Sequence, residues 1–179
     1  MTDSFPRGSR GATWMGLPLV AMLVLSAPPA RSAAPPTALV GREAPDFTLK
    51  STTGQNLRLS EYRGQVVLLN FWARWAGDSR RELPALDRIN ETYARAGLVV
   101  LGVSIEPDQR RAGEYAASLH VSYPVLIAGD DTLGRDYAID RMPMTILIDR
   151  AGIVRYVHVG FDNTDENMYL EQIRALLRD

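Results

Sequence analysis

Continuous apolar runs alternate with helical patterns along the chain, and this alternation predicts a buried sheet. Residues 66–71 and 98–105 are apolar almost without interruption, which is typical of strands buried on both faces. Helices are predicted after each run, over residues 79–96 and 107–119. This strand–helix–strand order indicates parallel strands joined by a helix.

The predicted helix over residues 79–96 has signals at both ends. Ser79 and Glu82 have the S-x-x-E spacing of a capping box, in which each side chain accepts a hydrogen bond from the other residue's backbone N–H. Gly97 supplies the stop signal. Pro84 removes one bond inside the helix and is expected to kink it.

Shorter elements complete the pattern. Residues 47–49 and 57–59 flank a Gly-containing turn and predict a β-hairpin, and residues 123–127 predict a short strand leading into a short helix. Residues 144–149 and 153–159 predict a second antiparallel hairpin.

A final helix is expected after Asn163 or Thr164, one of which caps it. Its apolar residues have helical spacing and are expected to pack on the sheet: Tyr169, Leu170, Ile173, Leu176 and Leu177. The elements together indicate an α/β domain with a central mixed sheet covered on both faces.

Residues 1–26 predict an export signal. Arg7 and Arg10 precede the apolar run 12–27, and small residues follow it. A cut after Ser26 fits this pattern. An uncleaved membrane anchor stays open, because the run is marginal in length for a hydrocarbon core of roughly 30 Å.

Residues 27–39 are rich in proline and alanine and predict an extended linker. The remaining residues, 40–179, form the expected folded domain. With an export signal before it, this domain is expected outside the cytoplasm, in the periplasm or another extracytoplasmic space. The N-terminal segment, if uncleaved, is its expected contact with a membrane.

Composition excludes several classes of partner and of chemical site. The chain has 179 residues, with 20 Lys and Arg against 21 Asp and Glu, and such a balance argues against a nucleic-acid partner. It contains no cysteine. A disulfide framework, a cysteine zinc site, an iron–sulfur cluster and a thiol nucleophile are therefore excluded.

Residues 70–84 (NFWARWAGDSRRELP) resemble the active-site segment of thioredoxin-fold proteins. They are most similar to the exported TlpA/ResA-like thiol-disulfide oxidoreductases, whose pattern is N-F-W-A-x-W-C-x-x-C-R-x-E-x-P. Three more motifs follow the same family in order. These are GREAPDFTL at 41–49, shared with AhpC/TSA-related redoxins, MPMT at 142–145 in the cis-proline loop, and IDRAG at 148–152. The resemblance implies a thioredoxin-like fold with an N-terminal β-hairpin and a cis Pro143.

The chain departs from that pattern at both redox positions, where Ala76 and Ser79 replace the cysteines. Thiol–disulfide exchange needs an attacking thiolate and a resolving thiol. Alanine has no nucleophilic atom, and a serine hydroxyl does not ionise near neutrality without a base. We therefore expect neither disulfide exchange nor peroxide reduction, and no catalytic residue.

Our leading hypothesis for this region is a polypeptide-binding groove without a covalent step. The family receives an extended polypeptide between the cysteine loop and the cis-proline loop. The resemblance places the groove at Trp75, Ala76, Gly77, Asp78, Ser79, Met142, Pro143 and Met144. The expected partner is an extracytoplasmic polypeptide.

Three other interpretations of the segment stay open. In the first it is a relic, with Ser79 capping a helix and Asp78 near the positive end of its dipole. In the second, free helix N–H groups bind an anion beside Arg74, Arg80 and Arg81. In the third, Ser79 is a hydrolase nucleophile, although it lacks a G-x-S-x-G elbow.

A metal or small-molecule site is a further alternative. His120 and His158, with Met142, Met144 or Met168, could hold a soft ion such as copper. The spacing does not require a metal, and we expect no metal and no cofactor. Asn70 occupies the position where some thioredoxins have a buried acid, and its amide supplies no base.

Overall fold

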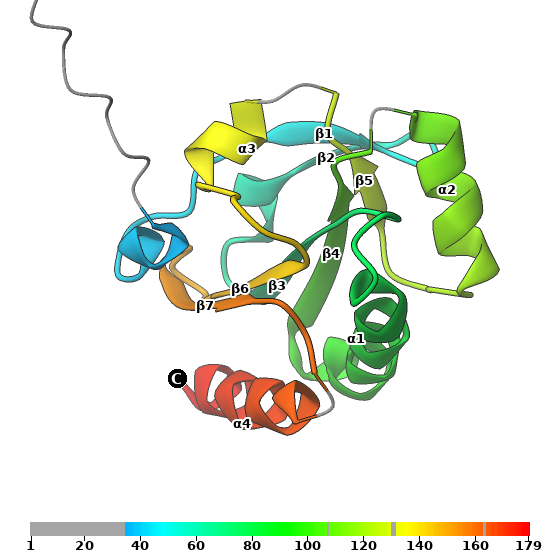
Figure 1. Ribbon diagram of the computed structural model, residues 1–179. Helices are drawn as coiled ribbons and strands as arrows, with labels where there is room; N and C mark the ends of the chain where they lie inside the picture. The colour runs from blue at the N-terminus through cyan, green and yellow to red at the C-terminus, as the bar shows by residue number, and fades with distance from the viewer. Residues whose placement is uncertain (1–34, 107, 130–131, 163) are drawn as a thin grey trace, which may run out of the picture. The chain divides into compact units, whose positions relative to one another are not determined.

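In the computed structural model, residues 35–106, 108–129, 132–162 and 164–179 are described. Within them, seven strands form one mixed sheet of order β2-β1-β5-β4-β3-β6-β7 (Figure 1). The strands are β1 (Thr48–Ser51), β2 (Asn56–Arg58), β3 (Val66–Trp72), β4 (Leu98–Ser104), β5 (Val125–Ile127), β6 (Met144–Ile148) and β7 (Val154–Val159). Strands β3, β4 and β5 are parallel, and the other pairs are antiparallel.

Helices cover both faces of this sheet. They are α1 (Ser79–Tyr93), α2 (Gln109–Ser118), α3 (Thr132–Asp136) and α4 (Asp165–Arg178), with 3-10 turns at Pro36–Leu39, Leu59–Tyr62 and Ala94–Ala96. The predicted α/β class, mixed sheet and N-terminal hairpin are confirmed.

The sheet separates two hydrophobic cores, and every residue of the central strand β3 is buried between them. Side chains alternate along a strand, so Leu68 and Trp72 pack with α1, α2 and α4, whereas Leu69 and Phe71 point to the other face. There they meet the residues around α3, including Tyr137, whose ring centroid is 4.9 Å from that of Phe71. The apolar run at residues 66–71 of the sequence is thus part of the fully buried central strand β3.

The ends of the helices differ in detail from the prediction. Helix α1 begins at Ser79, and Gly97 with φ 99° follows the 3-10 turn that ends it. Helix α2 begins at Gln109, where Asp108 accepts a hydrogen bond from the Arg111 N–H. The expected first residue, Pro107, lies outside the described residues. Thr164 precedes α4 but does not cap it through its side chain, and Asn163 is also not described.

The predicted export signal, residues 1–26, lies outside the described part of the chain. The end of the predicted linker is described, and it is not extended: Pro36–Leu39 form a 3-10 turn. Pro36 is buried and Leu39 packs against the core, which explains the turn. No helix in the described part of the chain is both long and apolar enough to span a membrane.

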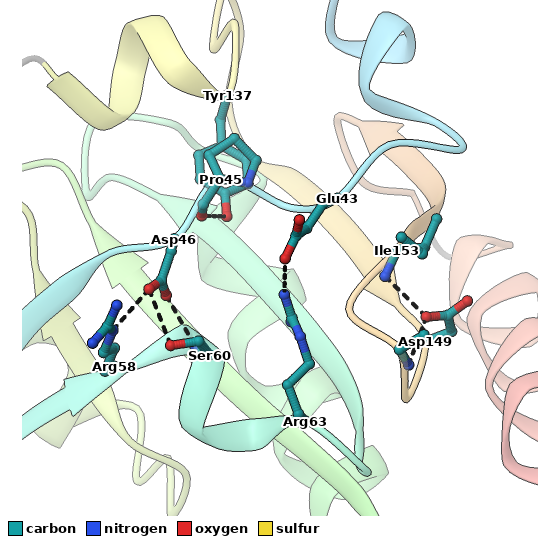
Figure 2. A network of polar contacts seen from close by, with 10 residues as sticks. Glu43, Pro45, Asp46, Arg58, Ser60, Arg63, Tyr137, Asp149 and Ile153 are labelled. Atoms are coloured by element: carbon teal, nitrogen blue, oxygen red, sulfur yellow. Dashed lines mark hydrogen bonds and ion pairs between the residues drawn. The ribbon is translucent and has the colours of Figure 1, made fainter.

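The A-P-D-F motif fixes the first hairpin to the domain (Figure 2). Asp46 accepts hydrogen bonds from Arg58 Nε at 2.7 Å, from the Ser60 N–H at 2.9 Å and from the Ser60 hydroxyl at 3.0 Å. Burial raises the pKa of Asp46, but these bonds outweigh burial and hold the pKa below its usual value. On the other side, the Tyr137 hydroxyl donates to the Pro45 carbonyl at 2.6 Å.

A second anchor joins the same segment to the β6–β7 turn. Arg63 pairs with Glu43 at 2.7 Å, and its guanidinium lies where a Cβ on Gly152 would be. Gly152 has φ 83°, a conformation that glycine adopts without strain. Asp149 closes the turn by accepting from the backbone N–H groups of Ala151 and Ile153. The I-D-x-x-G motif is therefore a structural one.

Candidate functional site

The two predicted site loops lie at the same end of the sheet, where β3 ends and β6 begins. In the β3–β6 pair, Phe71 lies opposite Met144, so the chain leaving β3 and the chain entering β6 are neighbours. The bond between Met142 and Pro143 is cis, as the resemblance implied. The Gly160 N–H donates to the Pro143 carbonyl at 2.8 Å, which brings the end of β7 to the same edge.

The predicted groove residues differ sharply in exposure. Trp75 is 65% exposed, Gly77 is exposed, and Asp78 and Met142 are half-buried. Ala76 is 8% exposed and Pro143 is buried. Ser79 and Met144 are fully buried, and Met144 packs in the core beneath the sheet edge. The accessible surface of the set, here called the candidate surface, therefore consists of Trp75, Gly77, Asp78 and Met142.

The loop that carries Trp75 is held by an acid that the sequence analysis did not single out. Glu106, 5% exposed and just beyond β4, accepts a hydrogen bond from the Arg74 N–H at 2.7 Å. The loop then turns, with the Ala76 N–H donating to the Ala73 carbonyl. Trp75 is thus exposed on an anchored backbone, so its position does not depend on packing of its own ring.

The predicted capping box is wrong. The residue before α1 is Asp78, and neither its side chain nor that of Ser79 caps the helix. Instead, Asp78 pairs with Arg81 at 2.6 Å. Glu82 does not reach back to the helix start, because its side chain points into the interior.

Glu82 is fully buried and bonded to three other elements. Its Oε1 accepts hydrogen bonds from the hydroxyls of Thr145 in β6 at 2.7 Å and of Tyr169 in α4 at 2.9 Å. Its Oε2 accepts from the Asn70 amide in β3 at 2.8 Å, and that amide also donates to the Thr145 hydroxyl. We call these four residues the Glu82 network.

Burial raises the pKa of Glu82 to about 7, although the three hydrogen bonds oppose this rise. The charge of Asp165 adds to it. The sequence contained a signal for this residue: Glu82 precedes Leu86 by four positions and Ile89 by seven, on the apolar face of α1. The buried acid of this domain is thus on α1, next to the Asn70 position where some thioredoxins have theirs.

The redox positions have no thiol chemistry. Ala76 offers only a methyl group, and the Ser79 hydroxyl is buried without a hydrogen-bond partner among the described residues. With no cysteine anywhere in the chain, thiol–disulfide exchange does not occur here. The buried, unactivated Ser79 also gives no support to the hydrolase interpretation.

Two other interpretations lose support from the arrangement of the fold. His120 follows α2, which packs on β5, whereas His158 lies on β7 at the far edge of the sheet. His158 instead bonds to Gln172 at 2.8 Å. The predicted anion site keeps Arg74 and Arg80 on the surface, but Arg81 is engaged by Asp78.

A surface depression of the described residues lies away from the candidate surface. A hollow of about 760 Å³ separates the β1–β2 hairpin from α2 and is lined by Lys50, Thr52, Gln109 and Arg110, among others. No residue of the candidate surface contributes to it.

Comparison with known proteins establishes the family. Residues 40–157 match the model of the AhpC/TSA family, and the chain belongs to this family. It is 32% identical over 136 residues to the thiol-disulfide oxidoreductase ResA of Geobacillus thermodenitrificans, an overlap of 75% of this chain and 78% of that protein. It is 35% identical over 144 residues to the thiol:disulfide interchange protein DsbE of Pseudomonas aeruginosa, covering 79% and 77%.

A solved structure agrees with these relatives. The crystal structure of a thiol:disulfide interchange protein of the DsbE type from Chlorobium tepidum matches with a TM-score of 0.74 and 34% identity. The match covers 77% of this chain and 97% of that one. The thioredoxin-like fold is thus shown, while the redox activity in the relatives' names is absent here.

Proposed function

We propose that this chain is a non-catalytic, extracytoplasmic module that binds a polypeptide at the candidate surface. The observation that carries the proposal is the exposure of Trp75, in the loop where the family pattern has its cysteines, at the end of β3 where β6 begins after the cis Met142–Pro143 bond. A large aromatic ring on an anchored loop contributes binding area at little entropic cost. The candidate surface therefore has an exposed side chain for contact with a partner but no thiol for covalent attack.

The backbone at the start of β6 is suited to binding an extended polypeptide. Strand β6 begins directly after Pro143, and an extended polypeptide beside such a loop bonds through its own main chain. Side chains then add specificity, with Trp75 and Met142 as the apolar contacts. The location outside the cytoplasm rests on the predicted export signal in residues 1–26.

Capture with matched baits tests this function. The full-length chain and the variants Trp75→Ala and Val40→Ala are immobilised and exposed to extracytoplasmic proteins of the source cell. Val40 is the control because it is also an exposed apolar residue, at 48%, but precedes the segment that pairs with the start of β7. We expect a protein that the native chain and Val40→Ala retain and Trp75→Ala loses.

The captured protein is then added to the isotope-labelled chain, and the Trp75 indole resonance is followed. A shift of that resonance on binding supports contact at the candidate surface. Equal retention by all three baits would place the interaction on another face. Retention of no protein would reject a polypeptide partner.

A further inference from the structure

Three exposed arginines adjoin the candidate surface along the chain: Arg74, Arg80 and Arg141. Arg74 directly precedes Trp75, and Arg141 directly precedes Met142. None of the three forms an ion pair with a residue that the structure describes, whereas seven other arginines form ion pairs at 2.6–3.3 Å. Their guanidinium groups are therefore available to a partner.

Two hydrogen bonds bring the segments that carry these arginines to the end of β7. The Arg81 guanidinium, next to Arg80 at the start of α1, donates to the Phe161 carbonyl at 3.3 Å. The Gly160 N–H donates to the Pro143 carbonyl in the cis-proline loop at 2.8 Å. The start of α1 and the cis-proline loop therefore lie at two consecutive residues of one short segment.

The acids of the same segments are for the most part already engaged. They are Asp78, Glu106, Asp140 and Asp162. All but Asp140 accept hydrogen bonds from neighbouring groups of the chain, and Glu106 is only 5% exposed. Among the charged side chains described here, three guanidinium groups and one carboxylate are thus left without a partner.

Guanidinium groups select the chemistry of a partner. Each has five N–H donors and no acceptor, and its planar shape matches a carboxylate through two parallel hydrogen bonds. Apolar contact is available from Trp75 and from Val159, which is 41% exposed and directly precedes Gly160. A matching polypeptide therefore has carboxylates close to an apolar side chain.

We propose that the polypeptide bound at the candidate surface is acidic, with Asp or Glu side chains on either side of an apolar residue. The proposal rests on the polypeptide-binding function above and names the chemistry of its partner. Arg74, Arg80 and Arg141 bind the carboxylates, while Trp75 packs against the apolar side chain. Opposite charges also accelerate the encounter of the two molecules.

Three synthetic peptides of equal length test this preference on the isotope-labelled full-length chain. Each has a central leucine, flanked on both sides by aspartates, by asparagines or by lysines. We expect the aspartate peptide to shift the Trp75 indole resonance and the Nε resonances of the three arginines, with an affinity that falls as salt is added. The asparagine peptide should bind at least about tenfold more weakly, and the lysine peptide should not bind.

Substitution of single arginines locates the contact. Arg80→Gln and Arg141→Gln should each weaken binding of the aspartate peptide by about two- to fivefold, as for one exposed ion pair. Arg95→Gln is the matched control, because Arg95 is also exposed without an ion pair among the described residues, but lies in the turn at the far end of α1. Equal weakening by Arg95→Gln would show an effect of net charge alone and would overturn the proposal.

The remaining outcomes separate this proposal from the proposed function. Equal binding of the aspartate and asparagine peptides would overturn the acidic preference and support a polypeptide-binding surface. Binding of no peptide would also overturn the preference, and the capture experiment then decides the function independently. Binding of phosphatidylglycerol vesicles through Arg80 and Arg141, without binding of the aspartate peptide, would assign the arginines to a membrane surface instead.

Discussion

Tyr169 of α4 donates its hydroxyl hydrogen to Glu82 of α1 across 2.9 Å, although 87 positions separate the two residues. Both side chains are fully buried. The contact joins the last helix of the domain to the helix that begins at the redox positions. It thus ties α4 to the first turn of α1.

Removing this hydroxyl is expected to destabilise the domain. In Tyr169→Phe the ring still fills the core, but one oxygen of a buried carboxylate loses a donor. Losses of this kind cost about 1–3 kcal/mol. Urea denaturation at pH 8, where Glu82 is ionised, measures the change in the free energy of unfolding. Tyr156→Phe, on the half-buried face of β7, is the control and should change it by less than about 0.5 kcal/mol.

Stability is expected to fall as the pH rises toward neutrality. The folded state holds the Glu82 proton with a pKa of about 7, whereas the reference value is 4.5, so the folded state binds more protons between these values. The contribution is fully present below about pH 4.5 and is lost as the pH passes 7. Its size is at most on the order of 3 kcal/mol.

Glu82→Gln isolates this contribution. Denaturation curves of both proteins are measured from pH 4.5 to 8.5, and the difference between their free energies of unfolding is plotted against pH. The variant is expected to lack the decline. Parallel pH profiles for the two proteins would show that Glu82 does not titrate in this range.

Restoring both cysteines is expected to restore redox chemistry. In Ala76→Cys with Ser79→Cys, the first thiol precedes the N-terminus of α1, where the helix dipole lowers its pKa and favours the thiolate. The double variant, once reduced, should reduce a model disulfide. Each single variant should fail to turn over, because no second thiol resolves the mixed disulfide. A folded double variant without activity would contradict our placement of the site.

Gly152→Ala is expected to destabilise the β6–β7 turn for two separable reasons. Its φ of 83° costs an L-residue about 1–2 kcal/mol, and the added Cβ displaces Arg63 from Glu43. Gly54→Ala, at φ 91° with open space around it, shows the backbone cost alone. The excess at Gly152 should stay below about 1 kcal/mol, as for an exposed ion pair, and should vanish in an Arg63→Ala background.

The sequence predicted the sheet and the order of its elements because β3 and β4 are apolar runs, and Gly97 ends the first helix by its backbone freedom. It failed for Ser79 and Glu82, where a local capping pattern competed with burial and tertiary hydrogen bonds prevailed. No local pattern indicates Glu106, because its role depends on a hydrogen bond from the Arg74 N–H, 32 positions away. Met144 was placed at the surface because a motif records position along the chain and not side-chain direction.

The pairing of residues 41–42 with β7 also determines where the chain enters the sheet. The Gly41 N–H donates to the Val154 carbonyl, and Val154 donates to Arg42, so the chain joins the sheet at the first residue of β7. The other end of β7 reaches Pro143 through Gly160, roughly 17 Å further along the strand. The start of the described domain is therefore held at one end of β7, and the cis-proline loop is held at the other.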